Sequence, residues 1–139
     1  MNTIMAKNNT WYGLNLLPIY VEIVESQLEA AHAQLEKLQA AESQIEGIDP
    51  RTLMRLNKLY SSQKMDNWVF FDQCKQWRNS NPNTEQLRLI AYVEKNAAQL
   101  DLISRQILVL IESLQQKRRQ EMADTGFDWL LKTFSGKSR

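Results

Sequence analysis

Nine successive positions in the first third of the chain alternate between spacings of three and four residues, and eight of them are apolar. They are Leu17, Val21, Val24, Leu28, Ala31, Leu35, Leu38, Glu42 and Ile45. An α-helix has 3.6 residues per turn, so an average repeat of 3.5 keeps one narrow seam on the side that faces a partner helix. The pattern therefore predicts long helices that lie side by side.

Few residues in this chain can interrupt a helix, because the 139 residues include only four glycines and three prolines. The periodicity predicts helices over about 15–47, 50–78 and 84–122, followed by a short amphipathic helix from 127. Asp49 before Pro50 is a helix start signal, and Asn83 with Gln86 can form a reciprocal cap. The polar residues 61–64 are a possible interruption of the second helix, and residues 124–126 are expected to end the third.

The expected fold is all-α: an elongated antiparallel three-helix bundle with a coiled-coil-like seam and a short C-terminal amphipathic helix. Residues 1–14 are interpreted as an N-terminal arm, 15–123 as the bundle, and 124–139 as the short helix with a basic tail. The third helix carries Val93, Leu100, Ile107 and Leu114 at sevenfold spacing, with further apolar residues on both flanks. Such a wide apolar stripe suits a helix that touches two neighbours at once.

The charges divide along the chain although the net charge is only +1. Residues 1–49 hold seven acids and two bases, whereas residues 50–82 hold two acids and six bases. An acidic first helix beside a basic second helix would be mutually attractive, by a few tenths of a kcal/mol for each exposed pair. Glu42 is the one charged residue of the seam, and two interpretations stay open: it fixes the register through a partner, or the seam is open to water there.

No catalytic or cofactor-binding arrangement is evident. His32 and Cys74 are the only residues of their kinds, and they lie on different predicted helices. Cys74 is interpreted as a buried apolar residue. Glu29 and His32 have the Glu-x-x-His spacing of di-iron bundles, but they lie beside the seam and a second copy of the motif is missing. The four glycines are isolated, which excludes a phosphate-binding loop. We therefore expect no enzyme, no cofactor and no metal.

Two groups of basic residues are candidate nucleic-acid contacts, because antiparallel packing brings the start of the second helix near the end of the third. The groups are Arg51, Arg55 and Lys58, and Lys117, Arg118 and Arg119. A merged basic patch would bind a phosphate backbone. The alternative interpretation, which we favour, is that these charges are solvated and complement the helix dipole.

Aromatic and aliphatic side chains form the candidate protein-binding surface. In the second helix, Trp68 and Phe71 share one flank while Phe70 and Trp77 share another, so some must cover a second surface. A helix as short as the last one is unstable alone and must dock on its own bundle, on a partner or on a lipid surface. The candidate partner-binding residues are Phe127, Trp129, Leu130, Leu131, Phe134, Trp68 and Phe71.

The sequence thus favours a cytoplasmic, non-enzymatic helical adaptor or assembly subunit that acts through helix-on-helix contacts. In architecture it resembles bacterial export chaperones and small helical subunits of large assemblies. The alternative is an accessory subunit of a nucleic-acid complex. Self-association through the seam of the first helix is a further expectation. A membrane span is not expected, because the richest apolar stretch, 14–24, is interrupted by Asn15, Pro18 and Glu22.

Overall fold

The computed structural model describes residues 11–137, and within them the secondary structure is entirely helical. A short 3₁₀ turn, η1 (Leu14–Leu16), leads into α1 (Leu17–Ala41). The 3₁₀ segment η2 (Glu42–Gly47) connects α1 to α2 (Pro50–Asp66), which α3 (Trp68–Arg78) continues in nearly the same direction. The chain then turns into α4 (Thr84–Lys137). The predicted all-α three-helix architecture is confirmed.

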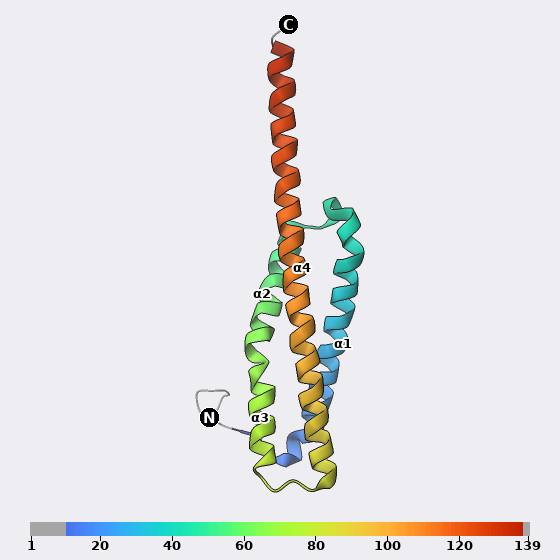
Figure 1. Ribbon diagram of the computed structural model, residues 1–139, viewed down its shortest axis with the longest axis vertical. Helices are drawn as coiled ribbons and strands as arrows, with labels where there is room; N and C mark the ends of the chain where they lie inside the picture. Colours follow the sequence, from blue (N-terminus) through green and yellow to red (C-terminus); the bar gives the residue numbers. More distant parts are fainter. Residues whose placement is uncertain (1–10, 138–139) are drawn as a thin grey trace.

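The 54-residue helix α4 is the axis of the molecule. α1 lies along one side of it, and α2 with α3 runs antiparallel along another (Figure 1). Five residues of the predicted seam of α1 are buried in the core: Leu17, Val24, Leu28, Ala31 and Leu38. Val21 and Leu35 are partly buried against it, and the side chain of Ile45 lies outside the described part of the chain. Because this seam packs inside the bundle, self-association through it, which the sequence suggested, would require α1 to leave its own core.

Two predicted caps start the second and third long helices. The Asp49 carboxylate accepts a hydrogen bond from the Arg51 backbone N–H at 3.0 Å, ahead of Pro50. Asn83 and Gln86 cap α4 reciprocally, since each side-chain oxygen accepts from the other residue's backbone N–H, at 2.7 and 2.9 Å. Both caps satisfy N–H groups that the first helical turn leaves without partners.

The breaks along the chain differ from the expected ones in two places before α4. α1 ends at Ala41 rather than near Gly47, and Gln44 within η2 has a non-helical backbone (φ −133°, ψ 57°). α2 passes through the polar residues 61–64, and the interruption lies at Asn67. Asn67 is buried, and its side-chain amide donates to the Ala97 carbonyl of α4 at 2.9 Å. A specific tertiary contact, rather than local polarity, therefore marks the boundary between α2 and α3.

The largest correction concerns the end of the chain. Residues 124–126 do not break the third helix, and the expected separate helix from 127 is part of α4, which continues to Lys137. The boundary that the sequence placed between 123 and 124 thus falls inside one helix. Gly126 costs a helix only about 1 kcal/mol relative to Ala, and the helix is already nucleated on the bundle. Adding residues to an existing helix avoids the unfavourable step of nucleating a second helix.

A contact at the other end of the bundle ties the N-terminal segment to α3. The buried Gln73 side chain accepts from the Tyr12 backbone N–H at 2.9 Å and donates to the Tyr12 carbonyl at 3.1 Å. The Trp77 indole N–H donates to the same carbonyl at 2.9 Å. Tyr20 of α1 stacks edge-on against Trp77, with ring centroids 5.1 Å apart. These contacts, which we call the Tyr12 clasp, hold the N-terminal segment against α3.

Candidate functional site

The main candidate site is the part of α4 that extends beyond the bundle. Leu114 is the last buried residue of α4 among those the structure describes, and residues 115–137, here called the arm, project past the ends of α1 and α2 (Figure 1). At 1.5 Å per residue the arm is roughly 35 Å long. A bundle with a projecting single helix is an arrangement in which one helical surface is left without a neighbour in the same chain.

The arm exposes large apolar side chains. Trp129, Leu130 and Leu131 are 64%, 46% and 51% exposed, and Met122 is also exposed. Positions 127 and 134 fall on the same helical face as Leu130 and Leu131, but the side chains of Phe127 and Phe134 lie outside the described part of the chain. Three of the five predicted partner-binding residues of this segment are therefore seen at the surface, on a continuous helix rather than a short separate one.

The predicted division of the α3 aromatics is confirmed. Phe70 and Trp77 are buried, whereas Trp68 and Phe71 are both partly exposed on the other flank. Cys74 is fully buried between the two core aromatics, and its thiol lies 3.9 Å from the Ile90 carbonyl oxygen. Burial, and secondarily the nearby Glu94 carboxylate, raises the pKa of the Cys74 thiol to about 12. The residue is an inert core side chain at neutral pH, as interpreted from the sequence.

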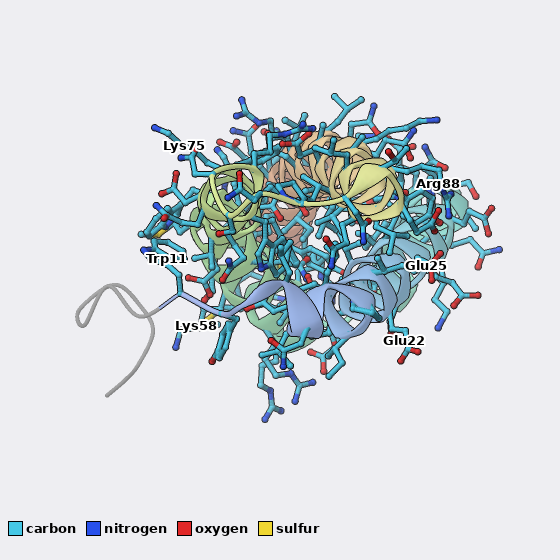
Figure 2. The ribbon with its side chains drawn as sticks, turned by 90° about the horizontal axis from the view of Figure 1, so that it is seen from below. Trp11, Glu22, Glu25, Lys58, Lys75 and Arg88 are labelled. Atoms are coloured by element: carbon cyan, nitrogen blue, oxygen red, sulfur yellow. The ribbon has the colours of Figure 1, made fainter. Side chains whose placement is uncertain are left out.

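The charged residues lie on the outside of the bundle. Seen end-on, Glu22 and Glu25 of α1 and Lys58, Lys75 and Arg88 of the other helices point away from the centre (Figure 2). No ion pair joins α1 to α2 among the described residues, so the expected attraction between these helices is not expressed in direct contacts. Arg78 pairs instead with Glu94 of α4 at 2.6 Å.

The predicted basic groups lie at one end of the bundle. The start of α2, with Arg51, Arg55 and Lys58, lies beside α4 at about the level where the arm begins (Figure 1). Arg51, Arg55 and Lys58 are exposed, as are Lys117 and Arg119, whereas Arg118 is partly buried. This placement agrees with the expected proximity of the two groups. Glu42 is exposed, which favours the interpretation that the seam opens to water at this end.

Two surface grooves lie on the bundle, and neither was predicted. One, of about 490 Å³, lies between α1 and the α2–α3 junction and is lined by Tyr20, Ile23, Leu59 and Phe70 among others. The other, of about 530 Å³, lies between the end of α1 and the middle of α4. Leu102 and Val109 line this second groove and are 57% and 69% exposed. The available signal in the sequence was that Leu102 and Val109 fall outside the apolar stripe that predicts the core-facing side of this helix.

The remaining candidate residues lie on the surface of α1. His32, Glu29 and Glu36 are exposed on α1, beside the buried seam. Among the side chains that the structure describes, no three from histidine, cysteine or the carboxylates are grouped as metal ligands would be. None of the helices described has a stretch both long and apolar enough to cross a bilayer.

Comparison with known proteins gives no relative: no family model, no curated protein and no solved structure matches this chain.

Proposed function

We propose that the protein is a non-enzymatic assembly subunit or adaptor, in which the three-helix bundle is a rigid base and the arm of α4 binds helices of partner proteins. The observation that carries this proposal is the run of exposed apolar residues, Trp129, Leu130 and Leu131, on a helix that has left its own bundle. Leu130 and Leu131 share a helical face with positions 127 and 134, and Trp129 lies on a neighbouring face, about 100° from Leu130. Helix-in-groove recognition uses such an apolar face, and tryptophan is enriched among the residues that dominate binding energies.

The continuity of α4 supports an adaptor role. A free helix of the arm's length is marginally stable in water, and ordering it on binding would reduce the affinity. Here the arm continues a helix whose Ile107, Ile111 and Leu114 are fixed in the core. The binding surface is therefore preformed, and a partner helix can pack on it without first nucleating it.

The test is affinity capture from native extract with the full chain and two matched variants. We expect the double variant Leu130→Asp/Leu131→Asp to lose captured proteins by at least about tenfold, since truncated anchors dominate interface energies. The control is Leu87→Asp, which introduces the same change at an exposed leucine near the start of α4. Circular dichroism should show the same helical content in all three proteins.

Equal capture by the double variant and the wild type would refute the arm as the binding surface. Capture that disappears after nuclease treatment, and falls steeply with added salt, would favour the alternative of a nucleic-acid complex bound through the basic groups. Capture that is lost equally in the Leu87→Asp control would indicate nonspecific association.

A further inference from the structure

The outward face of α4 carries a second heptad pattern that the core does not use. Ten successive positions alternate by four and three residues, and we call them the outer seam: Leu102, Gln106, Val109, Ser113, Gln116, Gln120, Ala123, Phe127, Leu130 and Phe134. None of the ten is charged, although charged residues make up 24% of the chain. Six of the ten are apolar, and a seam with this heptad spacing and no charge suits a helix that pairs along its length.

The described side chains of the outer seam are accessible. Leu102, Val109 and Leu130 are exposed, as are the three glutamines and Ala123, while Ser113 is partly buried. The seam lies roughly on the opposite side of α4 from Leu100, Ile107 and Leu114, as the step of about 100° per residue requires. A helix can therefore pack along the outer seam without displacing α1, α2 or α3.

The first four seam positions also form a concave surface. Leu102, Gln106, Val109 and Ser113 line the groove between α4 and the end of α1. Leu35 of α1 closes this groove on one side. A groove bounded by two helices receives the side chains of a third helix, so the bundle half of the seam is shaped for a helical occupant.

We propose that the occupant of the outer seam is a second copy of this chain, with the two α4 helices parallel and in register. The charges that flank the seam carry this choice. In a parallel pair, the residue before every second seam position, such as Ser113 or Gln120, meets the partner residue five positions after itself. This rule pairs Glu112 with the partner's position 117, a lysine, and Arg119 with the partner's position 124, an aspartate. Symmetry doubles both attractive pairs.

The same flanking residues disfavour an antiparallel pair. Matching apolar with apolar positions then requires the two-fold axis to pass near residue 118. That register places the Lys117 side chains of the two copies near each other, and likewise the two Arg119 side chains, so like charges meet at the centre. Glu112, Lys117, Arg119 and Asp124 are all exposed, so each is accessible to a partner helix.

The glutamines of the outer seam suit a pair of identical helices. In a parallel register each glutamine lies beside its own copy, and a side-chain amide both donates and accepts, so two such groups can satisfy each other. Polar residues at seam positions fix the register at some cost in stability. The arm carries five bases and three acids, so an anionic lipid surface is the competing occupant that the vesicle measurement below tests.

Because the proposed dimer forms through the same arm, it rests on the proposed function. Its test is chosen so that failure of the dimer can be distinguished from failure of the proposed function. The variant Ala123→Cys should form a covalent dimer under mild oxidation, since a seam position meets its own copy only in a parallel pair. Met122→Cys is the matched control: it lies next in sequence, is exposed, and points away from the seam. The native Cys74 is buried and should not react.

Sedimentation then tests the charges. We expect Arg119→Glu to weaken dimerisation about tenfold, and Arg119→Glu/Asp124→Arg to restore it, because the double change rebuilds both symmetric pairs with reversed sign. A chain that remains monomeric at every concentration would overturn the dimer, as would cross-linking only in mixtures of Ser113→Cys with Ala123→Cys, which reports an antiparallel pair. Binding of the monomer to phosphatidylglycerol vesicles would overturn it too. A monomer that still captures partner proteins would overturn the dimer alone and leave the proposed function standing.

Discussion

The Tyr12 clasp offers a stability test that local sequence reasoning would not suggest. Gln73 is 1% exposed and forms both a donated and an accepted hydrogen bond with the backbone of Tyr12. Replacing Gln73 by Leu keeps a similar volume but removes both bonds. The Tyr12 carbonyl retains its bond from the Trp77 indole, whereas the Tyr12 N–H loses its partner.

The expected cost follows from these bonds. A hydrogen bond contributes about 0.5–1.5 kcal/mol net, and the unpaired N–H adds a penalty if it stays away from water. Burial of the new leucine offsets part of this loss. We expect Gln73→Leu to lower the free energy of unfolding by about 1–3 kcal/mol, which corresponds to a fall in Tm of roughly 4 °C for each kcal/mol in a chain of this size.

The assay is thermal and urea denaturation followed by circular dichroism, with Gln76→Leu as the matched control. Gln76 lies on the same helix but is exposed, so the same replacement there should change stability by less than about 0.5 kcal/mol. Amide exchange of Tyr12 should also become faster in Gln73→Leu. Equal Tm values for the two variants, with unchanged Tyr12 exchange, would refute the reasoning that the clasp holds the N-terminal segment.

Two further predictions concern α4 and the core. Gly126→Ala should raise the helical content and add about 0.4–1 kcal/mol of stability to the arm, since Gly126 is helical and a Cβ there meets nothing within 4 Å; a loss of helicity on circular dichroism would mean that the chain breaks at this residue. The native Cys74 thiol should resist a small thiol reagent at pH 8 and react once the chain is unfolded. Burial raises the pKa of this thiol from 9.0 to about 12, so above pH 9 the thiol ionises more readily in the unfolded chain. The free energy of unfolding that comes from the protonated thiol is therefore fully present below pH 9 and should be lost as the pH rises from 9 to 12.

The sequence predicted those features that depend on the periodicity of a single helix or on its terminal residues. The seam of α1, the cap at Asp49 and the reciprocal cap between Asn83 and Gln86 were all predicted, because each depends on residues within a few positions of one another. The separation of Phe70 and Trp77 from Trp68 and Phe71 followed from the same helical geometry. Periodicity and capping are local signals, and the sequence contains them in full.

The errors came from contacts and energies that local signals do not contain. The Tyr12 clasp joins residues 61 positions apart in the chain, and the interruption at Asn67 depends on a carbonyl 30 positions away. The continuity of α4 through Gly126 was missed for another reason. Glycine and aspartate were interpreted as a stop signal, although their cost in a helix is smaller than the cost of starting a second one. The outer seam is polar at four of its ten positions, so apolar periodicity alone does not reveal it.

The exposed arm follows from where the apolar stripes of two helices end. Among the side chains that the structure describes, the last buried one in the seam of α1 is Leu38 and the last in the inward stripe of α4 is Leu114. Beyond Leu114, the inward positions of α4 are occupied by polar residues such as Glu121 and Thr125. A longer α1 would therefore meet charges rather than a core. Apolar residues return on the opposite face, around Leu130, and on one flank, at Met122 and Trp129, where no helix of the same chain is placed to cover them. The sequence of α4 thus directs one face to its own bundle and leaves the other exposed, and this exposed face is the one that we propose binds a second molecule.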